Sequence, residues 1–170
     1  IRNNYGYTGL VVENCEMVDA LADDLSSGNN VIVRWCNLHE SAGDAMKVGS
    51  NNLIEANYMH HLGTSEGAHA DGIQCLGGDN IVIRYNNINM PITDPAPYKA
   101  NANFISDNTK VTNVVIENNW LNGGGFTLYV HSGISVRNNR FGRDYRYGVR
   151  TGTPAQWANN VWDDTGVLIP

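Results

Sequence analysis

One short pattern of apolar and polar positions recurs along the chain. Each copy has an apolar residue, a mostly charged residue, any residue, Asn or Cys, any residue and a second apolar residue, as in IRYNNI at 83–88. The fourth position of the seven copies is occupied, at spacings of 21, 21, 29, 33, 20 and 21 residues, by Cys15, Cys36, Asn57, Asn86, Asn119, Asn139 and Asn160. Seven copies at these spacings indicate a repeat architecture.

The length of the repeat predicts its structure. A unit of about 21 residues with a short Val/Ile strand suits one coil of a parallel β-helix, whose neighbouring strands lie about 4.8 Å apart. A leucine-rich repeat has a similar period but requires a regular Leu pattern and a helical segment, which the sequence lacks. Equivalent Asn side chains would stack and hydrogen-bond backbone groups and each other. We expect an all-β solenoid of about seven coils with an Asn/Cys ladder, as one domain over 1–170.

The pattern between Gly9 and Trp162 resembles the right-handed parallel β-helix superfamily, which includes pectate lyases and polygalacturonases. The resemblance implies action on a polysaccharide, and parallel crossovers are overwhelmingly right-handed. At the ladder, Cys15 and Cys36 are expected to be two buried, stacked thiols, with a disulfide between them as the alternative. Cys75 is expected to be a core thiol.

Two coils are longer than the others. A second strand is expected after each ladder residue, with inward anchors at Met46, Ile73, Phe104, Leu128 and Val149. The anchor follows the ladder residue by 9 or 10 residues in regular coils, but by 16 and 18 residues in two adjacent middle coils. The extra residues fall at one corner, in segments 60–70 and 90–102. Solenoids place insertions on the face that binds, so this corner predicts the functional face.

Strand alternation identifies the side chains that should point outward from the second strands. They are expected to form a long polar face suited to an extended polysaccharide, and a merely solvated face is the alternative. The central outward column is Lys47, Gln74, Ile105, Tyr129 and Arg150, flanked by Asn103 and Thr127 on one side and by Asp107 and His131 on the other.

Two aspartates precede equivalent anchors by two residues. Asp44 and Asp71 should therefore stack one coil apart, about 4.8 Å. Two carboxylates that close repel unless a proton, a cation or a basic side chain lies between them. They are expected to cap turn amides, to bind Ca²⁺, or to act as an acid/base pair. The segment 69–72 (HADG) is similar to the Asn-Thr-Asp-Gly stretch of polygalacturonases.

The insertions carry further candidate chemistry. His60, His61 and His69 could meet across the base of the first insertion and bind a transition metal with Glu66 and Asp71, although loop histidines are usually only solvated. His69 and, in the second insertion, Tyr98 and Lys99 are candidates for substrate binding. The exposed aromatic candidates Trp35, Tyr58 and Tyr85 could stack on sugar rings or simply pack on the surface.

Composition limits the partners. The formal net charge is −6, with 11 Lys+Arg against 17 Asp+Glu, which argues against nucleic acid because a phosphate backbone calls for a basic face. No stretch approaches the roughly 20 apolar residues of a membrane helix. The resemblance to the β-helix superfamily implies a polysaccharide as the partner and an extracellular location. Segments 1–4 and 166–170 look like strands without a capping helix, so we expect either that the chain is a fragment of a longer β-helix or that another subunit covers its ends.

The leading interpretation is a secreted polysaccharide lyase for uronate-containing glycans. Resemblance to pectate lyases implies β-elimination, with Lys47, Tyr129, His131 and Arg150 as base, acid and carboxylate partners, and with Asp44 and Asp71 as Ca²⁺ ligands. The alternative enzyme is a glycoside hydrolase that uses two of Asp44, Asp71 and Asp107. A non-catalytic glycan-binding, tail-spike, adhesin or structural module is the alternative outside enzymes.

Overall fold

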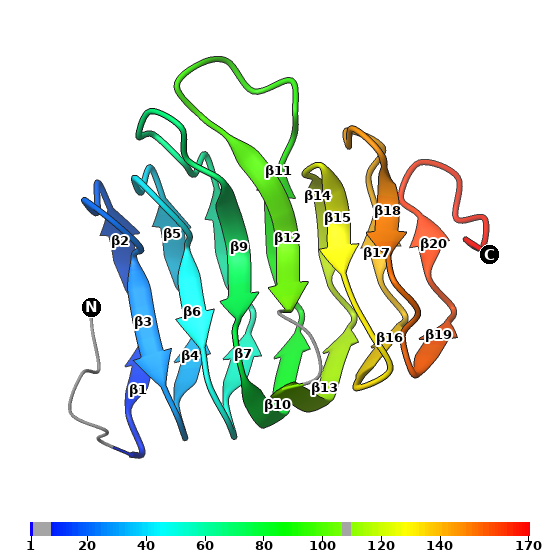
Figure 1. Ribbon diagram of the computed structural model, residues 1–170, viewed down its shortest axis with the longest axis horizontal. Coiled ribbons are helices and arrows are strands. Elements are labelled where there is room, and N and C mark those ends of the chain that lie inside the picture. Colours follow the sequence, from blue (N-terminus) through cyan, green and yellow to red (C-terminus); the bar gives the residue numbers. More distant parts are fainter. Residues whose placement is uncertain (2–7, 107–109) are drawn as a thin grey trace.

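The computed structural model describes residues 1, 8–106 and 110–170. Its strands form three parallel sheets, and the strands of each sheet follow one another along a single axis, coil by coil (Figure 1). The first sheet contains β1 (Val11–Glu13), β4 (Ile32–Arg34), β7 (Leu53–Glu55), β10 (Gly78–Arg84), β13 (Val111–Glu117), β16 (Ile134–Arg137) and β19 (Gln156–Ala158). The second contains β2 (Glu16–Val18), β5 (Asn37–His39), β8 (Tyr58–His60), β11 (Asn87–Met90), β14 (Trp120–Gly123), β17 (Arg140–Phe141) and β20 (Val161–Trp162). The third contains β3 (Leu25–Gly28), β6 (Met46–Val48), β9 (Ala70–Cys75), β12 (Ala100–Ser106), β15 (Phe126–Tyr129) and β18 (Gly148–Thr151).

This architecture confirms the expected parallel β-helix of about seven coils. Each full coil nevertheless contains three strands, where the sequence indicated two. The residue before each ladder position adopts a left-handed backbone conformation, with φ from 53 to 58°. It bends the chain and divides the repeated pattern between the first and second sheets. The strand β3 of the third sheet had no predicted counterpart.

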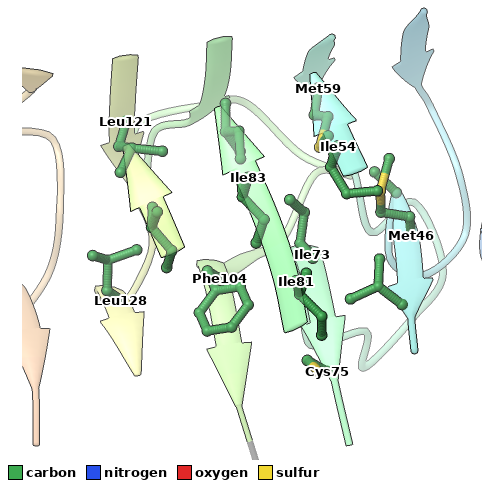
Figure 2. Packing of buried hydrophobic residues seen from close by; sticks show 14 of the residues in the cluster. Met46, Ile54, Met59, Ile73, Cys75, Ile81, Ile83, Phe104, Leu121 and Leu128 are labelled. Atoms are coloured by element: carbon green, nitrogen blue, oxygen red, sulfur yellow. The ribbon is translucent and has the colours of Figure 1, made fainter. Parts of the chain in front are cut away.

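The core lies between the three sheets. Figure 2 shows Met46, Ile73, Phe104 and Leu128 of the third sheet on the same interior as Ile83 of the first sheet. All five are 1% exposed or less. These four anchors are therefore inward as predicted, because alternate side chains of a strand point to opposite faces.

Behind the core, the asparagine ladder closes the bend between the first and second sheets. The backbone N–H of Asn57 donates to Oδ1 of Asn86 at 2.9 Å, and that of Asn86 donates to Oδ1 of Asn119 at 2.9 Å. The side-chain amides also donate along the row, as from Nδ2 of Asn86 to Oδ1 of Asn119 at 3.0 Å. Each Asn thus satisfies backbone groups that the bend would otherwise leave unpaired.

The cysteines differ from one another. Cys36 occupies the ladder and is buried, and Cys75 is buried in the core, as expected. Cys15 is exposed, so the expectation that it is buried is wrong. All three are free thiols. Cys15 lies in the coil of β1 and β2, which are the first strands of their sheets, and its Sγ bonds the carbonyl of Glu13 at 3.1 Å.

The last residues do not form the expected stacked strand. Residues after β20 fold back, and Leu168 makes an antiparallel bridge with Val161. Ile169 is buried against the core, and its carbonyl accepts a hydrogen bond from Nε1 of Trp157 at 2.9 Å. Over the described part of the chain, no helix has the length and apolar character needed to cross a membrane.

Candidate functional site

A row of aspartates lies at the corner where the chain enters the third sheet. The carboxylate Oδ1 of Asp44 accepts the backbone N–H of Asp71 at 2.8 Å, and Oδ1 of Asp23 accepts that of Asp44 at 3.3 Å. The expected stacking of Asp44 and Asp71 and their capping of backbone amides are therefore present. Asp23 extends the row by one coil, a residue that the sequence reasoning missed. Asn101 completes it by donating from Nδ2 to Oδ1 of Asp71 at 2.8 Å.

A lysine, rather than a metal ion, fits between these carboxylates. Nζ of Lys47 lies 2.7 Å from Oδ2 of Asp23 and 3.4 Å from Oδ2 of Asp44. Burial lowers the pKa of Lys47, but its hydrogen bonds and charge attraction to the two aspartates outweigh this and leave the pKa raised. Lys47 is therefore a cation with a structural role, unsuited to act as a base near neutral pH.

The same contacts make a poor Ca²⁺ site of Asp44 and Asp71. Calcium needs about six to eight oxygen ligands, whereas both oxygens of Asp44 already serve the Asp71 amide and Lys47. Among the described residues, no group of three or more His, Cys, Asp or Glu could hold a metal ion. The residues present do not fit the Ca²⁺ that the sequence suggested.

The outward column of the third sheet has the predicted order over four strands. Lys47 pairs with Gln74, Gln74 with Ile105, and Ile105 with Tyr129. The next partner of Tyr129 is Thr151. The register is thus one residue away from the predicted one.

Arg150, predicted in this column, instead pairs with Leu128, and its guanidinium lies 4.5 Å from the ring centre of Trp157. The placement of Arg150 on the outward face was wrong, because a slip of one residue moves a side chain to the opposite face. Val149, the expected anchor, packs only partly buried against the core.

Two predicted flanking residues face the interior. Nδ2 of Asn103 donates to the carbonyl of Asn122 at 2.9 Å, and the hydroxyl of Thr127 donates to the carbonyl of Gly123 at 2.9 Å. Both side chains are fully buried, so their predicted contact with substrate is contradicted. At this corner the chain has just left the second sheet, and simple alternation does not hold. Asp107, predicted on the other flank, lies outside the described residues.

The two insertions form a wall above the third sheet, and hydrogen bonds anchor this wall to neighbouring segments. They run from 61 to 69, between β8 and β9, and from 91 to 99, between β11 and β12. The second rises furthest above the strands in Figure 1. Its last residue, Lys99, donates its backbone N–H to Leu62 O at 3.0 Å and accepts that of Ala70 at 3.2 Å. At its start, Ile92 N–H donates to Asp144 O at 3.2 Å and the Thr93 hydroxyl bonds the Asp144 carboxylate.

A cleft of about 410 Å³ lies between this wall and the loop that precedes β18. We call it the tyrosine cleft, and its polar and aromatic lining consists of His69, Tyr98, Lys99, Asn101, Tyr129, Arg146 and Tyr147. The structure therefore brings together four of the predicted site residues from three separate coils. Arg146 and Tyr147 come from the 142–147 loop, where backbone bonds to Gly124 and Gly125 hold them at 3.0 and 2.8 Å.

The carboxyl group of Asp71 lies behind Asn101, which also lines the cleft. Asp71 is only 1% exposed. Burial, and then the charge of Asp44, raise its pKa to about 7, although hydrogen bonds from Asn101 and Gln74 oppose the change. Burial and the nearby Asp71 also raise the pKa of Tyr129. Tyr129 therefore keeps its phenolic proton near neutral pH.

The three histidines that were expected to meet at the first insertion do not come together. His60 and His61 touch, with 2.6 Å between their Nδ1 atoms, and burial together with the neighbouring imidazoles lowers the pKa of His60 to about 4. His69 lines the cleft instead. His131 lies in a smaller hollow of about 230 Å³ that shares Tyr129, where its Nδ1 accepts the backbone N–H of Gly133 at 3.1 Å.

Comparison with known proteins gives the same fold. The family described as the right-handed beta helix region matches residues 2–153. The chain belongs to this family. Neither the curated proteins nor the solved structures gave a match. Membership in the right-handed β-helix family establishes the architecture and the hand of the coils.

Two cleft residues of this β-helix, Arg146 and Tyr147, were missed because their coil has a regular length. A usable signal was present, since the segment 143–147 (RDYRY) concentrates charge and aromatic side chains at the same corner as the insertions. Asn101, next to the predicted Asn103, was also missed, because the register shifts between Ala100 and Ala102.

Proposed function

We propose that the protein binds a uronate-containing polysaccharide in the tyrosine cleft and cleaves it by β-elimination. The observation that carries this proposal is the lining of the cleft, which combines three tyrosines with Lys99 and Arg146 and includes no carboxylate among the described residues. Aromatic rings present apolar faces to sugar rings, and the two cations suit an acidic sugar. Such polymers occur outside cells, where we propose that the protein acts.

The charges favour an acidic ligand. Within the described chain, Lys99 and Arg146 form no ion pair with a protein carboxylate, whereas most of the other arginines do. The protein as a whole has a net charge of −6, so an anion is attracted only where cations gather. The tyrosine cleft is such a place, because two cations converge there on one hollow.

β-Elimination needs three contributions. A base removes the proton next to the uronate carboxylate, cations stabilise the charge that develops on that carboxylate, and an acid protonates the departing glycosidic oxygen. His69, an exposed residue of the cleft lining, takes the proton. Lys99 and Arg146 hold the carboxylate, and Tyr129 donates its proton as the carbon–oxygen bond breaks. The product carries a new carbon–carbon double bond at its non-reducing end.

Asp71 contributes by position rather than by contact. It holds Asn101 at the floor of the cleft. Burial, and then the charge of Asp71, raise the pKa of Tyr129, so this phenol is protonated near neutral pH. A glycoside hydrolase would need a pair of carboxyl groups flanking the bond. Asp71 could supply one as a protonated acid, but the lining of the cleft offers no second.

The test is incubation with polygalacturonate, alginate and a neutral glucan, measuring reducing ends and the ultraviolet absorbance of unsaturated products together. We expect both signals to rise on an acidic polymer. Tyr129→Phe should lower kcat about a hundredfold or more while binding persists, and Arg146→Ala should weaken binding. Arg143→Ala is the matched control, because Arg143 is paired with Asp164 outside the cleft. Reducing ends alone would indicate a hydrolase, binding without cleavage a binding module, and neither signal would refute the proposal.

A further inference from the structure

The bend between the first and second sheets requires a left-handed residue in every coil. Its φ lies between 53 and 58° in all seven coils. Asparagine adopts this conformation at little cost because its short amide bonds the local backbone. Four of the seven coils use it, at Asn14, Asn118, Asn138 and Asn159.

Three consecutive coils depart from this choice, with Trp35, Ala56 and Tyr85 at the same position. For such residues the left-handed conformation costs roughly 1–2 kcal/mol. The two aromatic side chains are also 51% and 58% exposed, so little burial offsets the cost. Strain that is confined to one patch and brings little burial in return indicates a functional surface.

These residues border a shallow groove on the outside of the bend, which we call the corner groove. It has a volume of about 730 Å³, and Trp35, Ala56, Tyr58 and Tyr85 line it. Trp35 and Tyr85 are two coils apart, roughly 10 Å, and the small Ala56 between them leaves room. Beyond Tyr85 a second hollow of about 460 Å³ continues along the ladder to Trp120.

The charged side chains around the corner groove are already paired. The guanidinium of Arg34 lies 4.3 Å from the ring centre of Trp35, and its Nη2 is 2.6 Å from Oε2 of Glu13. Arg84 lies 5.8 Å from the ring of Tyr85 and is paired with Glu55. The rings are thus held in place by cations whose charge is neutralised. The groove offers aromatic faces, side-chain amides and the carboxylate of Glu16, which lies 3.0 Å from Nε2 of His39.

We propose that the corner groove binds a neutral oligosaccharide that lies along the solenoid axis, as a second glycan site separate from the tyrosine cleft. The apolar faces of successive sugar rings would stack on Trp35 and Tyr85, and hydroxyl groups would bond the amides of Asn37 and Asn87, which also line the groove. A row of ring faces that repeats with the coils suits a polymer that repeats along its length. The neutralised cations disfavour acidic polymers and nucleic acids.

Substitution by the residue that the other coils use gives a sharp test. We expect Trp35→Asn and Tyr85→Asn each to weaken binding by about tenfold. Both should fold at least as stably as the wild type, because Asn relieves the left-handed strain. The probes are oligosaccharides of glucose, xylose, mannose and galactose, with binding measured by calorimetry and tryptophan fluorescence and folding by urea denaturation. Loss of binding with retained stability is not a folding defect.

The two glycan sites are separable. Tyr147→Ala, in the tyrosine cleft, should leave binding of the neutral oligosaccharide unchanged, and Trp35→Asn should leave activity on acidic polymers unchanged. The proposal is overturned if no neutral oligosaccharide binds at millimolar concentration. It is likewise overturned if binding survives in the double variant that combines Trp35→Asn with Tyr85→Asn. It is also overturned if sedimentation shows self-association that the Asn variants abolish, since the groove would then be a protein contact.

Discussion

Asn86 is the ladder residue whose removal should be most informative. Its Oδ1 accepts the backbone N–H of Asn57 at 2.9 Å and the side-chain amide of Asn57 at 3.0 Å. Its Nδ2 donates to the carbonyl of Ile54 at 2.9 Å and to Oδ1 of Asn119 at 3.0 Å. The side chain is 2% exposed, so water cannot replace these partners without opening the bend.

In Asn86→Ala, the buried backbone N–H of Asn57 loses its acceptor, which costs about 1–3 kcal/mol. The bonds to Ile54 and Asn119 are lost as well, at about 1 kcal/mol each. The free energy of unfolding should therefore fall by roughly 3–5 kcal/mol. The backbone N–H of Asn86 still donates to Asn119, so the loss should stay local to one bend.

The assay is urea denaturation followed by circular dichroism and tryptophan fluorescence. Asn87→Ala is the matched control, because the neighbouring Asn87 is exposed and forms no side-chain hydrogen bond within the described structure. It should change stability by less than about 0.5 kcal/mol. If Asn86→Ala lost less than about 1 kcal/mol, the ladder could not be a main source of stability.

Three further results are expected. Folding raises the pKa of Asp71 from 3.8 to about 7, so the folded state keeps a proton that the unfolded state releases between these values. The free energy of unfolding should then fall as pH rises from about 4 to 7. In Asp71→Asn this total fall should be smaller by up to about 4 kcal/mol. An equal pH dependence of the two proteins in urea denaturation would contradict this. Gly123→Ala should cost several kcal/mol or prevent folding, because φ is 92° and a Cβ would lie 1.8 Å from the carbonyl oxygen of Met90; Gly67→Ala, at φ 73° with nothing within 4 Å, should cost only about 1 kcal/mol by thermal melting. A thiol reagent should modify Cys15 in the native protein and the two buried thiols only after denaturation, and rapid native reaction of all three would show that the buried assignments are wrong.

The sequence was sufficient for the features that repeat with the coil. The ladder could be recognised because every bend needs the same side chain to satisfy the same backbone groups, as Asn86 and Asn139 do for the backbone N–H groups of Asn57 and Asn119. The stacking of Asp44 and Asp71 followed from their equal distance to successive anchors. The position of the insertions followed in the same way, because extra residues at one corner disturb the count between ladder and anchor.

The sequence was insufficient where the position of a residue depends on the register between neighbouring strands or on the direction of its side chain at a corner. A slip of one residue between β15 and β18 moved Arg150 away from the predicted face. Asn103 and Thr127 turned inward because the strands begin at a corner, where backbone carbonyls of the second sheet need donors. The tyrosine cleft itself depends on Arg146. The approach of its loop to the insertions is fixed by the hydrogen bond from the backbone N–H of Ile92 to the carbonyl of Asp144.

Both hollowed surfaces lie where the coil pattern is broken. The tyrosine cleft lies beside two insertions, and the corner groove lies where Trp35 and Tyr85 replace asparagine. The asparagine part of the ladder tolerates little change, because the side chains of Asn57, Asn86, Asn119 and Asn139 each bond the coils on both sides. Variation is therefore confined to loops and to the outside of the bends, where a substitution leaves the stack intact. In such a solenoid, departure from the repeat is itself a guide to function, and it directs mutagenesis first to these two surfaces.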